Sequence, residues 1–378
     1  MNKKILFVGS FPPPFHGSSV YFQNLINHPV LNSKFEVITL NTGDPRHDLD
    51  NLGKLDYINA KTAIKNLFEF YKICKEKKPD LVYINTPQGI AYVREGFFIL
   101  ISKIFFNLKI IQHLHGSEFL NFYGRAGMFM KYFVNLTQKK IEYSIVLSDN
   151  IKYIFKRWQK PENIFSVPNG IRPEVNYKSR NIDGRLPVLF FFSNLLKFKG
   201  LMLTLEVLEI IKKDYPGIML NIAGGWGYDW YYELHQDKVK DEFYKIIEEK
   251  KLKDNIVFKG PVDDKRKSDL LEESDILIYP TQMYGFPIVI LEAMSAGCPV
   301  ITAKMVGAIP EVVMNGETGF LISDYNSERY AEALKKIIES PELFSRMSVK
   351  SRKRFDEKYT LEKNVENISS TFDKILNE

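Results

Sequence analysis

Cysteine is scarce in this chain, which has only Cys74 and Cys298 among its 378 residues. Two cysteines exclude a disulfide framework or a zinc cluster, and such sparse use is typical of proteins in a reducing cytosol. Long hydrophobic runs are also absent, because the longest one, residues 97–111, is interrupted by two lysines and an asparagine. Since about 20 apolar residues are needed to cross a bilayer, no membrane-spanning helix is expected. The apolar run after Met1, residues 5–8, is too short for a secretory leader.

The loop after the first predicted strand also lacks the fingerprint of dinucleotide-binding proteins. The loop after the first predicted strand, residues 9–19, contains no Gly-x-Gly-x-x-Gly, which argues against a nicotinamide or flavin enzyme. Its Gly-Ser turn precedes a predicted helix, where backbone amides can hold an anion or a sugar oxygen. A stiff proline turn with a capping serine is the structural alternative.

The hydrophobic pattern predicts an α/β fold. Short β-branched or aromatic runs, such as Ile5–Val8 and Val188–Phe192, alternate with segments of helical periodicity, and this succession occurs twice. We therefore expect two doubly wound, Rossmann-like domains facing each other across a cleft. The first domain is predicted at residues 1–175 and the second at 182–358. A last amphipathic helix, at about 360–378, is expected to pack back on the first domain.

Charge is divided unevenly between the two halves. The formal net charge is +6, but the residues through Arg180 carry +11 and the remainder −5. The basic first half suggests an anionic partner such as a lipid surface, a lipid-linked phosphate or nucleic acid. Aromatic residues interleave with basic ones in two stretches, residues 119–140 and 151–160, which predicts peripheral membrane binding there. The alternative is that these aromatics are core and the lysines merely solvated.

Several polar groups follow predicted strands, where parallel sheets bind ligands. His115 lies beside a Gly turn and Glu118 at the end of the fourth strand, a setting suited to hydrogen-bonding a substrate. Lys199 stands next to a predicted helix start, where ammonium and backbone amides can act together on a diphosphate. His113 is a weaker candidate than His115, and metal binding is not favoured because no further Cys or His lies at ligand spacing.

Residues 279–300 form the densest motif. A strand ends at Pro280, a loop presents Gly285 and Phe286, and a helix begins with Pro287 in its first turn. Free amides at the start of that helix can hold phosphate oxygens. Glu292 lies inside the same apolar helix, and a buried acid is costly unless it is paired or faces a ligand. By contrast, the Asp48-Leu49-Asp50 sequence sits in a polar loop, so a metal–nucleotide site is not favoured there.

These motifs together resemble glycosyltransferase family four, the group 1 glycosyltransferases, which have the two-domain GT-B fold. The most specific region combines residues 279–300 with residues 306–322, which contain Glu311 and the sequence Asn-Gly-Glu-Thr-Gly-Phe-Leu. His115-Gly116, Pro168-Asn169-Gly170 and Lys199-Gly200 follow in the family's order. The opening Pro-Pro-Pro-Phe-His-Gly is similar to members that build bacterial surface polysaccharides.

The resemblance implies retaining transfer of a sugar from a nucleotide donor, commonly a UDP-sugar, without a metal or other cofactor. It assigns His115 to the transferred sugar, Lys199 to the diphosphate and Glu292 to the ribose hydroxyls. The further donor-binding candidates are Gly17, Ser18, Asn194, Gly224, Gly225, Val262, Tyr284, Gly285, Phe286, Pro287 and Ile288. The candidates on the acceptor side are His16 and Glu118. The acceptor is expected to be a saccharide or a polyprenyl-diphosphate-linked saccharide, and no nucleic acid is expected as a partner.

Two positions depart from the family pattern. The family usually has an arginine five residues before the lysine that corresponds to Lys199, and this chain has Asn194 there. It usually has a glutamate eight residues before the glutamate that corresponds to Glu292, and this chain has Tyr284 there. The first change removes a charge from the diphosphate site, and the second removes a carboxylate for donor-sugar hydroxyls. Two other functions therefore stay open: a non-catalytic GT-B subunit that binds sugar nucleotide, and another GT-B enzyme such as a UDP-sugar epimerase. The expected location is the cytoplasm, with attachment to the inner face of the cell membrane.

Overall fold

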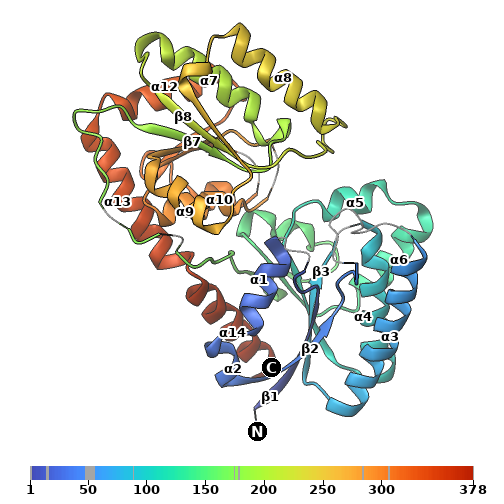
Figure 1. Ribbon diagram of the computed structural model, residues 1–378. Helices are drawn as coiled ribbons and strands as arrows, with labels where there is room; N and C mark the ends of the chain where they lie inside the picture. The colour runs from blue at the N-terminus through green and yellow to red at the C-terminus, as the bar shows by residue number, and fades with distance from the viewer. Residues whose placement is uncertain are drawn as a thin grey trace. The chain divides into compact units, whose positions relative to one another are not determined.

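The computed structural model describes residues 2–13, 17–46, 56–87, 89–173, 175–177, 179–282, 285–304 and 307–377. The chain divides into two compact units (Figure 1). The first unit comprises Met1–Asn169 and Leu361–Glu378, and the second comprises Gly170–Thr360. None of the helices in these described ranges combines the length and the hydropathy that a bilayer-spanning helix requires.

The first unit is built on a parallel sheet of six strands in the order β2-β1-β3-β4-β5-β6. The chain leaves β1 toward one edge and returns to build β3 to β6 toward the other. The order therefore reverses between β1 and β3, and loops at the carboxyl ends of strands beside such a reversal form ligand sites in open α/β sheets. The strands are β1 (Lys3–Gly9), β2 (Phe35–Asn41), β3 (Leu81–Thr86), β4 (Lys109–Leu114), β5 (Tyr143–Val146) and β6 (Ile164–Ser166).

Helices cover both faces of this sheet. The helices α1 (Gly17–Ile26), α2 (Pro29–Lys34) and α14 (Leu361–Asn377) pack on one face. The other face is covered by α3 (Tyr57–Lys77), α4 (Tyr92–Phe105) and α6 (Met128–Gln138), which lie side by side (Figure 1). Shorter elements are α5 (Phe119–Arg125) and the 3-10 turns η2 (Gly89–Ala91), η3 (Asp149–Ile154) and η4 (Pro161–Asn163).

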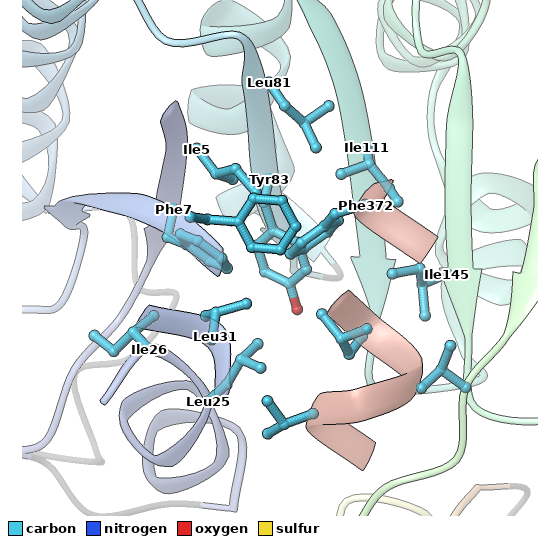
Figure 2. Packing of buried hydrophobic residues seen from close by; sticks show 14 of the residues in the cluster. Ile5, Phe7, Leu25, Ile26, Leu31, Leu81, Tyr83, Ile111, Ile145 and Phe372 are labelled. Carbon is cyan, nitrogen blue, oxygen red and sulfur yellow. The ribbon is translucent and has the colours of Figure 1, made fainter. Parts of the chain in front are cut away.

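The C-terminal helix α14 is part of the first unit's core. Its apolar residues recur at helical spacing and are buried, and Figure 2 shows Phe372 against Phe7 and Tyr83 of the sheet. The Phe372 ring centroid lies 5.8 Å from that of each of these two residues. Burying one such side chain contributes about 1.5–3 kcal/mol, so the last helix holds to the first unit although residues 170–360 intervene in the sequence.

The second unit repeats the design with strand order β12-β11-β10-β7-β8-β9, again all parallel. Its order reverses between β10 and β7. The strands are β7 (Val188–Phe192), β8 (Met219–Ala223), β9 (Ile256–Gly260), β10 (Ile276–Tyr279), β11 (Val300–Ala303) and β12 (Gly319–Ile322). The helices are α7 (Leu201–Asp214), α8 (Gln236–Glu249), α9 (Asp264–Glu273), α10 (Ile288–Ser295), α11 (Ile309–Val312), α12 (Ser327–Ile338) and α13 (Pro341–Lys358), with 3-10 turns η5 (Lys197–Lys199) and η6 (Lys253–Asn255). The predicted pair of Rossmann-like α/β domains is confirmed.

Residues 179–185, around the predicted start of the second domain, are bonded to the second unit. The buried carboxylate of Asp275 accepts hydrogen bonds from both Arg185 terminal nitrogens, at 2.6 and 2.8 Å, and from the backbone amide of Val188 at 2.8 Å. Arg180 donates to the carbonyl of Ala296 at 2.7 Å. The polar composition of residues 179–185 therefore reflects their ion pairs and carbonyl contacts with the second unit.

Candidate functional site

The predicted donor-binding residues of the second unit follow four neighbouring strands. Lys199 follows β7, the pair Gly224-Gly225 follows β8, Val262 follows β9, and Gly285–Ile288 follow β10. Because these strands are parallel and adjacent in the sheet, all four loops emerge at the same edge. The Lys199 loop and the loop after β10 stand on the two sides of the strand-order reversal, where open sheets bind ligands.

The Lys199 turn and the loop after β10 are held together by backbone contacts. The amide of Gln282 donates to the carbonyl of Phe198 at 2.8 Å. Gly200 has φ +92°, and a Cβ there would lie 2.4 Å from the carbonyl oxygen of Pro280. A larger residue at position 200 would therefore push the two loops apart, so glycine sets the spacing between Lys199 and the approach to α10.

Asp229 fixes the Lys199 turn from the other side. It is fully buried, and its carboxylate accepts from the amide of Phe198 at 3.2 Å and from the amide of Tyr232 at 3.1 Å. The Phe198 ring packs against Trp230, with centroids 5.0 Å apart. Asp229 was not predicted as a site residue, because nothing in its local sequence distinguishes it from any other loop aspartate.

The two lysines of this turn have different surroundings. Lys197 Nζ is 2.7 Å from a carboxylate oxygen of Glu242 on α8, and it also lies over the Tyr232 ring. Lys199 Nζ lies 5.2 Å from the centroid of the Phe198 ring, and its side chain is half-buried. Lys197 therefore ties the turn to α8, whereas Lys199 directly precedes Gly200, where the turn meets the loop after β10.

Close packing against the loop after β7 requires a glycine at position 224. Its φ is +143°, and a Cβ there would lie 1.7 Å from the carbonyl oxygen of Ser193. Its amide already donates to the carbonyl of Gly260 at 2.8 Å, and the carbonyl of Gly225 accepts from Leu195 at 2.8 Å. The Gly224 amide is thus engaged in joining loops of the sheet edge, and a donor contact by these two glycines stays a prediction.

Within the part of the chain that the structure describes, no side chain caps the N-terminus of α10. Its N-cap is Pro287, which has no group to accept from the first-turn amides. The loop before it is anchored at Phe286, a buried ring 6.2 Å from that of Tyr359, and at the Gly285 carbonyl, which accepts from Ala308 at 3.2 Å. The helix start is held in place by these contacts, and amides in such a first turn favour an anion.

Glu292 has a cationic neighbour that the sequence did not reveal. Lys267, on α9, places Nζ 3.2 Å from Oε1 of Glu292, and the two side chains are only 15% and 10% exposed. The carboxylate of Asp264 lies 3.6 Å from the same ammonium. The expectation that an acid in an apolar helix is paired or faces a ligand is therefore met by an ion pair between neighbouring helices.

In the first unit, His115 follows β4 at the carboxyl edge of its sheet. Burial lowers the pKa of His115 to about 4, and the side chain of Asn169 offsets part of that effect. Burial, followed by the proximity of His115, lowers the pKa of His113 well below its usual value. Both rings are therefore neutral near pH 7. Among the described residues, Nε2 of His115 has no hydrogen-bond partner, which leaves one polar atom for a ligand.

Aromatic and amide groups position the two imidazoles. The His113 and His115 centroids are 4.0 Å apart, and the Tyr21 ring of α1 lies 4.5 Å from His115. The Tyr21 hydroxyl donates to Asn364 of α14 at 3.0 Å, and the Asn364 amide donates to the carbonyl of Pro168 at 2.6 Å. On the far side, His113 Nδ1 is 2.5 Å from the Tyr83 hydroxyl. The C-terminal helix thus supports the histidine site, which the sequence did not predict.

The remaining predicted site residues are less constrained. Gly17 opens α1, and a Cβ there would meet no atom of the described residues within 4 Å; Ser18 is the second residue of that helix. Glu118, the N-cap of α5, accepts from the Asn121 amide at 2.5 Å, and Asn194 is exposed. His16 and Tyr284, like the disfavoured Asp48 and Asp50, lie outside the described residues.

Comparison with known proteins supports the motifs. Residues 174–354 match the family "Glycosyl transferases group 1". An uncharacterized glycosyltransferase of Haemophilus influenzae is 27% identical over 328 residues, which cover 85% of this chain and 84% of that protein. A poly(ribitol-phosphate) alpha-N-acetylglucosaminyltransferase of Staphylococcus aureus is 24% identical over 230 residues, or 60% of this chain and 43% of that protein.

A solved structure shows the same fold. HepE of Anabaena, crystallised with UDP and glucose, superposes with a TM-score of 0.71 over 99% of this chain and 100% of its own, at 18% identity. The predicted GT-B fold is therefore confirmed. The resemblance indicated by the sequence is supported, because residues 174–354, which contain Lys199, the α10 loop and Glu292, match the group 1 glycosyl transferases.

Proposed function

We propose that this chain is a retaining glycosyltransferase that moves a sugar from a UDP-sugar to a saccharide or polyprenyl-diphosphate-linked saccharide during surface polysaccharide synthesis. The observation that carries the proposal is the joining of the Lys199 turn to the loop before α10, at the strand-order reversal of the second unit. The UDP bound to HepE supports a UDP-sugar as the donor. The poly(ribitol-phosphate) in the name of the S. aureus relative supports a role in the synthesis of a surface polymer.

Each site residue has a role in this reaction. Lys199 and the first amides of α10 bind the diphosphate, Glu292 accepts from the ribose hydroxyls, and residues near Val262 meet the base. Neutral His115 donates or accepts a hydrogen bond at a hydroxyl of the transferred sugar through Nε2.

In the reaction itself, the bond from the anomeric carbon to the diphosphate breaks, the bond to the acceptor oxygen forms on the same face, and the acceptor proton passes to the diphosphate. Fixed positive charge beside the leaving group lowers the barrier, because it is in place before the charge develops.

A donor panel tests this function directly. We expect UDP-sugars, in preference to GDP-sugars, to stabilise the purified chain by about 2.7 kcal/mol at 100 times the dissociation constant. One of them should be turned over with a lipid-linked acceptor, giving a product of retained anomeric configuration by NMR. EDTA should leave the rate unchanged. Binding of UDP without turnover of any donor would instead favour a non-catalytic subunit, and inversion would refute the retaining mechanism.

Lys267 should matter to donor binding through Glu292. Lys267→Met removes the ammonium beside the mostly buried carboxylate of Glu292, which then loses a contact that holds it in place, so we expect the donor KM to rise about tenfold, or 1.4 kcal/mol. Because Lys267 acts on binding, kcat should change little, and Lys267→Arg should restore most of the affinity. Steady-state kinetics on variants checked for folding by circular dichroism measure this. An unchanged KM in Lys267→Met would show that the pair is only structural.

A further inference from the structure

The outer faces of three helices in the first unit carry large apolar side chains exposed to solvent. Most of these side chains are more than half exposed, and on each helix they recur at spacings that place them opposite the buried residues. Soluble proteins seldom expose contiguous apolar area of this kind unless it binds something. The residues are Ile64, Phe68 and Tyr71 on α3, Phe97, Ile104 and Phe105 on α4, and Phe129, Tyr132 and Leu136 on α6; we call them the three-helix face.

Ring contacts make this surface continuous from one helix to the next. Tyr71 of α3 meets Phe105 of α4 at a centroid distance of 5.6 Å. Phe97 of α4 meets Phe133 of α6 at 5.4 Å. The three helices lie side by side on one face of the sheet (Figure 1), so their outward residues form one layer.

This location differs from the one that the sequence pattern indicated. Phe119 and Tyr123 are buried core residues, and the half-buried Trp158 donates its indole N–H to Asn135 at 2.8 Å. The structural alternative is therefore correct for these aromatics of α5 and the 151–160 stretch. In the predicted attachment region, Tyr153 is exposed in the 151–160 stretch, and the larger exposed apolar surface lies on α6. That surface continues onto α4 and α3, which the sequence pattern did not indicate.

The charge on the same helices is mostly positive. Together α3, α4 and α6 contain eight basic and three acidic residues, and α6 contains no acid. Lys61, Lys65 and Lys72 are exposed along one side of the apolar stripe of α3. Apolar and aromatic residues fringed by lysines are the pattern of surfaces that lie in a membrane interface. Two copies of this face would bring like charges together, which disfavours self-association.

We propose that the three-helix face binds the surface of an anionic bilayer, with its aromatic side chains inserted among the head groups. Each lysine near an anionic leaflet adds to the attraction, and salt weakens it. The inference rests on the proposed function in one respect: a lipid-linked acceptor is presented at such a surface. Vesicle binding itself requires no turnover, so the two can fail separately.

Vesicle cosedimentation tests the face with two variants at its opposite ends, Phe68→Ser on α3 and Phe129→Ser on α6. Both side chains are exposed, so folding should be preserved. We expect binding to phosphatidylcholine vesicles with 30% phosphatidylglycerol, weakened about tenfold by each substitution and strongly by 0.5 M salt. Tyr228→Ser removes an exposed aromatic from the second unit and is the matched control; it should bind like the unmodified chain.

Three results would overturn the proposal. The first is equal binding to neutral and anionic vesicles, and the second is equal binding by all the variants. The third is a dimer in analytical ultracentrifugation that Phe129→Ser dissociates, because a second copy would then be the occupant. UDP binding measured on the same variants should be unchanged, so a failed donor panel would count against the proposed function and leave the membrane result standing.

Discussion

Lys199→Ala should lower kcat for sugar transfer about 10²- to 10³-fold, while the chain stays folded. In the proposed reaction the leaving diphosphate gains charge as the bond to the anomeric carbon breaks. Lys199 is held beside it by a turn that Gly200, Asp229 and the bond from Gln282 to Phe198 fix in place. A preorganised donor of this kind contributes about 2.7–4 kcal/mol of transition-state stabilisation in enzymes where one has been removed. Single-turnover kinetics at saturating donor measure the loss.

The neighbouring lysine provides the control. Lys197 is two residues away on the same turn, with the same charge, but its ammonium is paired with Glu242. We expect Lys197→Ala to keep kcat within a few-fold of the unmodified chain, because an ion pair of this exposure is worth at most about 1 kcal/mol. If both variants lose activity equally, the effect belongs to the turn as a whole. If Lys199→Ala retains full kcat, the diphosphate lies elsewhere.

The fold was predictable because the apolar residues that become buried recur along the sequence with the period of the helix or strand that contains them. Strands such as Ile5–Val8 are buried on both faces of a parallel sheet, and they read as short apolar runs. Helix α14 shows a 3.6-residue apolar period, and the structure places that stripe on the sheet of the first unit. Lys199 could be named because it stands beside a predicted helix start after a strand, and Glu292 because it is an acid inside an apolar helix.

Partners that meet across long sequence separations left no such pattern. Lys267 and Glu292 are 25 positions apart on different helices, and neither helix's periodicity predicts that they meet. Asp229 looks like any loop aspartate until its contacts with Phe198 and Tyr232 are known. Gly224 was assigned to ligand contact, whereas its steric constraint comes from the carbonyl of Ser193. Pairings of this kind are set by the three-dimensional fold, so only the structure reveals them.

The free energy of unfolding should fall by about 2 kcal/mol between pH 8 and pH 5 through His115, and His113 should add to this fall in the same direction. Burial depresses the pKa of both histidines in the folded state, that of His115 to about 4, whereas in the unfolded chain each titrates near 6.5. Below pH 6.5 the unfolded state binds two protons that the native state does not, so stability is lost as the pH falls. His115 contributes about 2 kcal/mol of this loss over the interval, and the contribution of His113 has the same sign.

A substitution separates His115 from the other titrating groups. Among these, Asp56, with a lowered pKa, adds to the loss in acid, and Glu95, whose pKa burial raises, opposes it. Their effects cancel when the unmodified chain is compared with His115→Gln at each pH. Urea unfolding at pH 8, 6.5 and 5 should show a drop about 2 kcal/mol smaller in the variant. An equal drop in both proteins would mean that His115 is charged at pH 5, and its proposed role as a neutral hydrogen-bonding group for the transferred sugar would then have to be abandoned.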